Sequence, residues 1–217
     1  SLALAADLVV AHTNFVAAAV QDYTGRRDVT VIPHPVPVGM LHHPRSVPPV
    51  LDVPDAARLA IHFGVLKRRY KGTAIVTQMA TAGVPGWIFA VLGVGASARG
   101  PVLAAPGFLA PGALCGAVAR SHATLLPYTI ASQSGAVVLA QVLGSVPVAS
   151  AVGGIPEQIV DGDTGVLVPP GATADRWRSA LADLDESPRA AMAARAQARV
   201  WADHAVFASR VTEICSA

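Results

Sequence analysis

The side chains with the most useful chemistry in this sequence lie in a short basic and aromatic run. Lys67-Arg68-Arg69-Tyr70-Lys71-Gly72 follows an apolar segment and precedes a helical pattern. Basic side chains at such a position can bind a diphosphate through charge-assisted hydrogen bonds. A solvated basic loop is the alternative interpretation, and the run taken by itself favours that alternative.

A second candidate is the small polar loop Ser132-Gln133-Ser134-Gly135, which opens an apolar helical run. Backbone N–H groups at a helix N-terminus point at an anion, and the helix dipole favours negative charge there. An ordinary helix cap formed by Ser132 or Ser134 is the alternative, and both interpretations can hold together. The residues expected to bind phosphate are Ser132, Gln133, Ser134, Gly135, Ala136 and Val137.

These loops must be positioned by a regular alternation of strands and helices. The expected strands are residues 6–11, 29–32, 59–63, 87–92, 123–126, 146–149 and 166–168, with a short one near Val102. The expected helices are residues 15–23, 73–82, 111–120, 136–143, a short one opened by Pro156, and then 175–184, 189–201 and 205–214. This alternation predicts an α/β fold, a Rossmann-like doubly wound parallel sheet with helices on both faces. Ligands bind beyond the carboxyl ends of such strands, so the loops at 64–72, 93–100, 108 and 128–135 should share one edge.

The chain is expected to have three parts. Residues 1–54 end in a proline-rich stretch from Pro33 to Pro54, which predicts a linker. Residues 55–186 carry the regular alternation, and residues 187–217 should form C-terminal helices, with caps at Ser187 and Asp203. Because the chain opens at Ser1 inside an apolar run, we expect a fragment that has lost its beginning.

An ordered series of motifs then places the chain beside a known family. The series is Val146-Pro147-Val148-Ala149-Ser150, Val152-Gly153-Gly154-Ile155-Pro156-Glu157, Asp161-Gly162, Thr164-Gly165 and Leu167-Val168-Pro169-Pro170-Gly171. It resembles the donor-binding core of the retaining GT-B glycosyltransferases, the glycosyl transferases group 1 with the Glu-x7-Glu motif. The resemblance extends more loosely over nearly the whole chain, and it identifies residues 55–186 as the C-terminal, nucleotide-sugar-binding domain. It also implies that residues 1–54 are the remnant of an N-terminal acceptor domain plus the linker.

The resemblance implies roles for several residues. Lys71 matches the family's diphosphate-binding lysine, and its basic partner is Arg68 or Lys67, depending on the direction in which the loop is counted. Phe108 and Leu109 match the positions that line the nucleobase slot, although a core phenylalanine is an equally good interpretation.

The sequence departs from the family where two glutamates eight residues apart usually contact the donor sugar and the ribose. Counting places Ser132 and Ala140 at those positions, so both carboxylates are absent. Gln133 is the nearest polar substitute. The usual contacts to sugar and ribose are therefore in question.

The function that the resemblance implies is transfer of a hexosyl group from a nucleotide diphosphate sugar to an acceptor hydroxyl, with retention of the anomeric configuration. Lys71 and Arg68 would stabilise the leaving diphosphate, and the acceptor side would lie in another domain. A degenerate module that binds nucleotide sugars without turnover and a sugar-nucleotide epimerase are the alternatives. A nicotinamide dehydrogenase is disfavoured, because no Gly-x-Gly-x-x-Gly follows the first strand of a βαβ unit.

The amino-acid composition excludes some classes of protein and of binding site. The 217 residues are 53% hydrophobic with a net charge of +2, which allows a sizeable core and gives no nucleic-acid signal. Two cysteines cannot form a disulfide framework and suit a reducing compartment, so we expect a cytoplasmic protein. His42-His43 has no third ligand, and Asp161-Gly162-Asp163 is better interpreted as a turn, so we assign no metal and no resident cofactor. No membrane span is predicted, although a preceding domain could contact a membrane peripherally.

Overall fold

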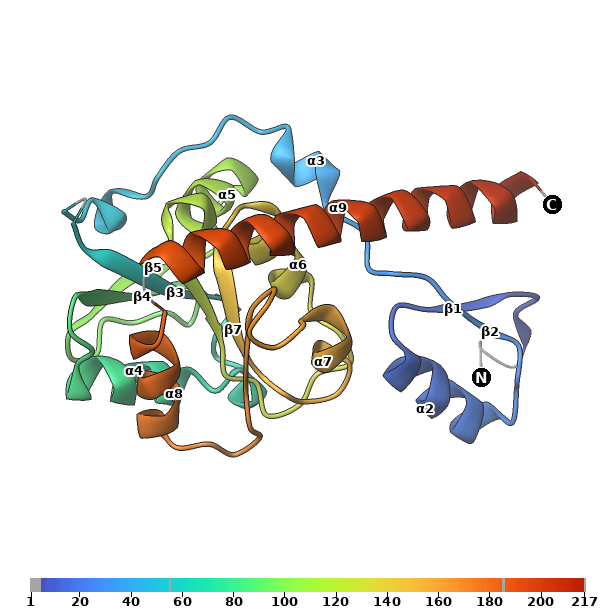
Figure 1. The fold of residues 1–217 in the computed structure, drawn as a ribbon, viewed down its shortest axis with the longest axis horizontal. Coiled ribbons are helices and arrows are strands. Elements are labelled where there is room, and N and C mark those ends of the chain that lie inside the picture. The colour runs from blue at the N-terminus through green and yellow to red at the C-terminus, as the bar shows by residue number, and fades with distance from the viewer. Residues whose placement is uncertain (1–4, 55, 185, 217) are drawn as a thin grey trace.

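The computed structural model describes residues 5–54, 56–184 and 186–216. It contains a small N-terminal unit and a larger α/β domain, with a long C-terminal helix that reaches both (Figure 1). The predictions that concern Ser1 lie outside the described residues.

The larger domain is built on one six-stranded sheet in which every pairing is parallel. In spatial order the strands are β5 (Val102–Pro106), β4 (Trp87–Val94), β3 (Arg58–Val65), β6 (Ala123–Leu126), β7 (Val146–Ser150) and β8 (Val166–Val168). The chain builds outward from β3 to β5, then returns to the other side of β3 and continues to β8. This is the strand order of a doubly wound dinucleotide-type fold, and the predicted fold class is confirmed.

Helices cover both faces of the sheet, as the alternation predicted. On one face, α4 (Thr73–Ala82) and α8 (Ala174–Ala182) bury their apolar sides against the sheet. On the other face lie α5 (Pro111–Arg120) and α6 (Gly135–Val142). A short helix, α7 (Ile155–Gln158), lies between β7 and β8.

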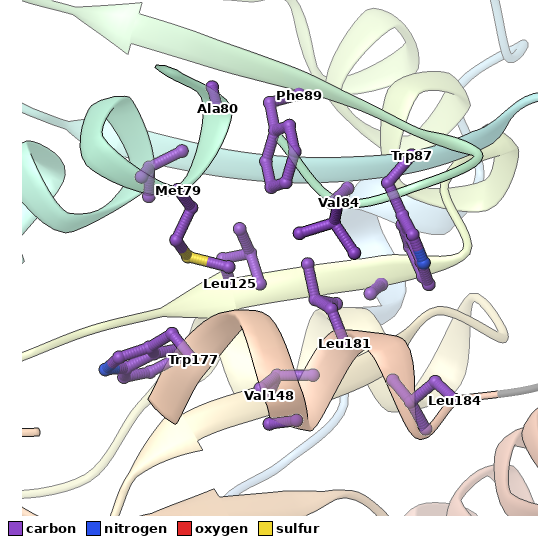
Figure 2. Close-up of a cluster of buried hydrophobic side chains, with 14 of the residues drawn as sticks. Met79, Ala80, Val84, Trp87, Phe89, Leu125, Val148, Trp177, Leu181 and Leu184 are labelled. Carbon is purple, nitrogen blue, oxygen red and sulfur yellow. The ribbon is translucent and has the colours of Figure 1, made fainter. Parts of the chain in front are cut away.

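The core between α4, α8 and the sheet contains the largest side chains of the domain. Figure 2 shows Trp177, Leu181 and Leu184 of the α8 segment facing Met79 of α4 and Phe89 of β4. Burial of these side chains is the main driving force for assembling this layer.

Strand alternation distributes the residues of β3 between the two layers. Leu59, Ile61 and Phe63 face α5 and α6, whereas Ala60 faces α4 and α8. His62 shares the face of Ala60 and is fully buried. Its Nδ1 lies 2.8 Å from the carbonyl oxygen of Leu125, and its Nε2 lies 3.1 Å from the Thr73 hydroxyl.

The hydrogen bonds of His62 fit a neutral ring. Nδ1–H donates to the carbonyl, and Nε2 accepts from Thr73. Burial lowers the pKa of His62 from 6.5 to about 4, against the smaller opposing effect of the Leu125 carbonyl and with a further lowering by the Lys71 charge. The folded protein therefore resists protonation of His62.

The N-terminal unit is a parallel pair of strands with one helix. It consists of β1 (Val9–Ala11), α2 (Asn14–Thr24) and β2 (Val29–Val31). Its strands do not join the main sheet.

The proline-rich segment that follows packs along the larger domain. It includes α3 (Val38–Leu41) and a 3-10 turn, η1 (Pro49–Leu51). A Cβ at Gly112 would lie 2.1 Å from the carbonyl oxygen of Pro44, so the segment contacts the backbone of α5 directly. Leu51 is 1% exposed and joins the core beside α5. The predicted linker is thus held on the surface of α5 over much of its length.

The C-terminal part differs from the expected pair of helices. A single helix, α9 (Glu186–Ser216), begins before the predicted start at Arg189 and continues through Asp203. Asp203 does not begin a new helix. It lies inside α9, and its carboxylate is 3.8 Å from Nε of Arg199 one turn earlier, a spacing that contributes modestly to helix stability. The side chain of Ser187, the other expected cap, lies outside the described residues.

α9 joins the two parts of the molecule. Met192, Ala193, Ala196 and Val200 are buried against the larger domain. Further along, the ring of Phe207 lies 6.3 Å from that of His12 in the N-terminal unit. Figure 1 shows the helix crossing the domain and extending past it toward β1. No helix in the described ranges has the length and apolar character needed to cross a membrane.

We predict that Leu181→Ala destabilises the larger domain by about 2–5 kcal/mol, because Leu181 is fully buried and the deletion leaves a cavity. Chemical denaturation would measure the free energy of unfolding. Leu8→Ala is the matched control: Leu8 is 42% exposed, and its truncation should cost about 0.5 kcal/mol or less. Equal losses in the two variants would contradict the packing described for α8.

We also predict that the protein loses stability between pH 7 and pH 5 because of His62. The unfolded chain binds a proton near the ordinary value of 6.5, whereas the folded protein does so only near 4. The free energy of unfolding should therefore fall by about 2 kcal/mol over this range. In His62→Gln, which has an amide donor and acceptor but no titratable group, this part of the pH dependence should disappear, and an unchanged pH profile would contradict the prediction.

Candidate functional site

The main cavity of the larger domain lies where the strand order reverses, between the carboxyl ends of β3 and β6. Ligands of doubly wound sheets bind at this point, because the loops that follow the two strands diverge there. The cavity has a volume of about 520 Å³. The loop after β3 contributes Tyr70 and Lys71 to its wall, and the loop after β6 contributes residues 130–136.

Lys71 is the cation of this cavity. It ends the 3-10 turn η2 (Arg69–Lys71), and its Nζ donates to the Tyr128 hydroxyl at 2.8 Å. The same Nζ lies 4.0 Å from the centre of the Tyr128 ring and 5.6 Å from that of Tyr70. The two rings stabilise the charge by cation–π attraction, while burial lowers the pKa of Lys71 below its ordinary value.

Two glycines lie next to Lys71, and one of them, Gly72, is required by the close approach of two loops. A Cβ at Gly64 would lie 3.8 Å from Nζ, so the side chain of Lys71 passes over the bare backbone at the end of β3. Gly72 adopts a left-handed conformation with φ of 67°, and a Cβ there would lie 1.8 Å from the carbonyl oxygen of Pro127. Only glycine fits at position 72, because any side chain would collide with the backbone that follows β6.

The N-terminus of α6 forms the other polar wall of the cavity. Ser134 caps the helix by accepting from the Val137 N–H at 3.4 Å. Gly135 and Ala136 are the first two residues of the helix, so their N–H groups have no acceptor within it. They lie in the cavity wall, where they can donate to an anion.

Gln158 of α7 fixes this helix start from outside. Its Oε1 accepts from the Ser134 N–H at 2.7 Å, and its Nε2 donates to the Ser134 carbonyl at 3.2 Å. Its own carbonyl accepts from Gln141 of α6 at 2.9 Å. These bonds hold the backbone of Ser134 in one orientation and thereby aim the first N–H groups of α6.

The structure brings together six of the residues expected to bind the donor. Lys71 lines the same cavity as the residues of the polar loop, namely Ser132, Gln133, Ser134, Gly135 and Ala136. Val137 lies beneath them, fully buried, and its N–H is taken by the helix cap.

Other expected site residues lie apart from the cavity. Lys67 and Arg68 are exposed at the start of the basic loop and do not line it, so the basic partner of Lys71 stays open. Phe108 follows β5 and is 90% exposed, which excludes the core interpretation. Leu109 is half-buried against the core of the α5 face.

The roles of three residues were not anticipated: Gln158, Phe15, and Tyr128, which was expected at this edge but not as the partner of Lys71. Burial raises the pKa of Tyr128, so it is a neutral hydroxyl partner for Lys71. In the sequence, Tyr128 could have been recognised as a site residue because it follows directly after a predicted strand and a proline. Phe15 reaches the cavity from α2, more than 100 residues away in sequence from the loop it faces, and no local pattern indicates that contact.

Among the described residues, no group of three or more histidine, cysteine, aspartate or glutamate side chains could hold a metal ion. The polar groups of the cavity are instead an ammonium, two tyrosine hydroxyls, small polar side chains and backbone N–H groups. This set suits an anion with several oxygen acceptors.

Comparison with known proteins gives the family. The family description "Glycosyl transferases group 1" matches residues 60–186, more than half of the chain. No curated protein matches the sequence.

Solved structures share the fold at low identity. Sucrose-phosphate synthase from Thermosynechococcus elongatus has 18% identity and a TM-score of 0.78, covering 97% of this chain and 58% of its own. Anabaena HepE, in complex with UDP and glucose, has 18% identity and a TM-score of 0.79, covering 98% of this chain and 64% of its own. WaaG, a glycosyltransferase involved in lipopolysaccharide biosynthesis, has 14% identity and a TM-score of 0.72, covering 93% of this chain and 60% of its own.

The chain therefore spans about three fifths of the length of these structures. The parallel sheet and its flanking helices match the Rossmann-like half of a GT-B fold. On the strength of the family match, the chain belongs to the glycosyl transferases group 1.

Proposed function

We propose that this chain is the donor-binding half of a retaining hexosyltransferase, which moves a hexosyl group from a nucleotide diphosphate sugar to an acceptor hydroxyl. The observation that carries the proposal is the convergence of Lys71 and the first N–H groups of α6 on one cavity. The complexes of HepE with UDP and with UDP-glucose support a nucleotide-sugar ligand for this fold.

The chemistry asked of this half is stabilisation of the departing diphosphate. Negative charge grows on the phosphate oxygens as the glycosidic bond breaks, and fixed donors lower the barrier most when they bind the transition state more strongly than the ground state. Lys71, with Arg68 or Lys67 as its partner, would supply charge. The N–H groups of Gly135 and Ala136 would supply directed hydrogen bonds. No metal and no resident cofactor is part of this proposal, since the nucleotide sugar is a substrate.

The sugar end of the site differs from the family pattern. Ser132 and Ala140 stand where the two glutamates are expected, and Ala140 is fully buried inside α6. Gln133, in the cavity wall, is the polar side chain available to a sugar hydroxyl. The absence of both carboxylates favours one alternative, a module that binds nucleotide sugars without turning them over.

The acceptor and its half of the enzyme lie outside the proposal for this chain. A sugar, a lipid-linked sugar or a small molecule could be the acceptor, and contact with a membrane would come through that other half. The proposed place of reaction is the cytoplasm. The two cysteines, one buried and one exposed, are free thiols and fit a reducing compartment.

We predict that Lys71→Ala weakens binding of a nucleoside diphosphate by at least about tenfold. A charged hydrogen bond contributes about 1.5–3 kcal/mol, and 1.4 kcal/mol is tenfold in affinity. Binding of the bare nucleoside should change little. Calorimetry with UDP, GDP and ADP, beside the matching nucleosides, would measure both. Arg176→Ala on the exposed side of α8 removes a positive charge away from the cavity and serves as the control.

Lys67→Ala and Arg68→Ala, measured beside Lys71→Ala, would decide which residue is its partner. Gly135→Val should also weaken binding, because a Cβ at Gly135 already lies 3.6 Å from the His34 ring and further methyl groups would crowd the helix start. If Lys71→Ala and Gly135→Val both keep full diphosphate affinity in folded protein, the donor site does not lie here.

We predict that the 217-residue chain binds a nucleotide sugar but does not transfer the sugar. The groups that orient an acceptor would belong to the part of the GT-B fold beyond this chain. A thermal-shift screen with UDP-glucose, GDP-mannose and ADP-glucose would identify the donor, and release of nucleoside diphosphate would report turnover. Because hydrolysis by water also releases nucleoside diphosphate, the contradicting outcome is transfer of the sugar to an added acceptor. Such transfer by this chain alone would show that its acceptor side is already present. It would also exclude the non-catalytic alternative.

A further inference from the structure

A carboxylate of the larger domain caps a helix of the N-terminal unit. Glu157 of α7 accepts from the Asn14 backbone N–H at 2.7 Å and from the Asn14 side-chain amide at 2.8 Å, both through Oε2. Its Oε1 accepts from the Phe15 N–H at 2.8 Å. Both oxygens are used, and the partners are separated from Glu157 by more than 140 residues of chain.

The cap is more than α2 needs for its own formation. Thr13 is the local cap residue and accepts from the Val16 N–H at 3.2 Å. The remaining N–H groups, of Asn14 and Phe15, could bind water if the helix start were exposed. Glu157 therefore contributes mainly to where α2 lies, and the helix dipole favours a carboxylate there. Burial would raise the pKa of Glu157, but the hydrogen bonds from Phe15 and Asn14 outweigh it and lower that pKa.

Two glycines that precede α7 allow the N-terminus of α2 to lie close to α7. A Cβ at Gly154 would lie 2.7 Å from the side chain of Thr13 and 2.3 Å from the carbonyl oxygen of Ser132. A Cβ at Gly153 would lie 1.5 Å from the carbonyl oxygen of Ala131 and 3.5 Å from the Phe15 ring. Thr13 is 1% exposed and donates from its hydroxyl to the Ser132 carbonyl at 3.4 Å.

Phe15, whose backbone N–H is bound by Glu157, forms part of the cavity wall. It lines the cavity together with Ser132 and Gln133, while half of its surface remains exposed. Lys71 and the first N–H groups of α6 are the anion-binding groups of the same cavity. Phe15 faces the end where the family pattern expects contacts to the donor sugar, and an aromatic ring there offers an apolar surface to the C–H face of a pyranose.

We propose that Phe15 is a specificity-determining residue that contacts the transferred hexose, and that Glu157 is the positioning residue that holds it in the cavity. The inference rests on the proposed function for the identity of the ligand. The contact between Glu157 and α2 itself does not depend on any ligand.

The test compares the affinity for a nucleotide sugar with the affinity for the free nucleotide in Glu157→Gln, in Phe15→Ala and in the double variant. The ligand pairs are UDP-glucose with UDP, GDP-mannose with GDP, and ADP-glucose with ADP, and the pair that binds wild type is used for calorimetry. Each single variant should bind the nucleotide sugar about fivefold more weakly, with the affinity for the free nucleotide unchanged. The double variant should lose no more than Phe15→Ala alone, because both changes remove the same contact.

Two matched controls lie on exposed positions of helices. Glu213→Gln makes the same chemical change on α9, and Tyr23→Ala removes an aromatic ring that is 81% exposed on α2 itself. Both should leave the affinity for the nucleotide sugar unchanged. Equal losses for nucleotide sugar and free nucleotide in Glu157→Gln would show a general structural role and would overturn the positioning role. Losses that add in the double variant, or no loss in Phe15→Ala, would also overturn the inference.

Hydrogen exchange separates this inference from the proposed function. In Glu157→Gln, which leaves one oxygen where two were used, the amides of Asn14 and Phe15 should exchange faster than in wild type and in Glu213→Gln. Unchanged exchange would mean that Glu157 does not hold α2, whatever the protein binds. If wild-type protein binds none of the three nucleotide sugars, the proposed function and the sugar contact of Phe15 both fail, while faster exchange would still establish Glu157 as the residue that places α2.

Discussion

The cavity depends on the direct contact of loop backbones at the carboxyl edge of the sheet. A Cβ at Gly72 would collide with the carbonyl oxygen of Pro127, one at Gly93 with that of Gly64, and one at Gly153 with that of Ala131. All three glycines have positive φ, so the positions exclude side chains both by space and by conformation. The loop after β6 is thereby fixed against the loops after β3 and β7, while Gly64 and Gly93 are paired residues of β3 and β4. Side-chain contacts such as that of Gln158 with the Ser134 backbone then orient the polar groups that these loops carry.

The ammonium of Lys71 is a partly buried charge in this cavity. The described residues give its ammonium two tyrosine rings and one hydroxyl as partners, but no carboxylate. Burial therefore disfavours the charged form, and an incoming anion would supply the missing counter-charge. At the end of the cavity where the two glutamates are absent, the Ser132 carbonyl accepts from the Thr13 hydroxyl and from the N–H of Gly154. This end of the cavity is organised by backbone contacts.

The fold could be predicted from the sequence because its signals are local. The helices 73–82 and 111–120 and the strands 123–126 and 166–168 have the expected bounds, since Gly, Pro and apolar periodicity mark them clearly. The polar loop at Ser132–Ala136 and Lys71 could be placed at one edge for the same reason. α9 was expected as two helices, because a lone Asp203 looks the same in sequence whether it caps a helix or pairs with Arg199 inside one.

The missed contributors depend on contacts that no window of sequence contains. Gln158 holds the start of α6 from 24 residues away, and Glu157 holds Asn14 and Phe15 across more than 140. Polar residues in a short helix carry no sign of such partners. Phe108 shows the converse case, where an aromatic residue expected in a slot or a core lies almost fully exposed.

The continuous C-terminal helix has a mechanical consequence. At 1.5 Å per residue, the 31 residues of α9 form a rod about 46 Å long. Its first half is bound to the larger domain. In its second half, His204 accepts from the Val36 N–H of the proline-rich segment, and Phe207 lies beside His12 of the N-terminal unit. A rigid strut of this kind couples the two parts at a distance from the cavity. The N-terminal unit is therefore held at two separate places, by Glu157 beside the cavity and by Phe207 of α9.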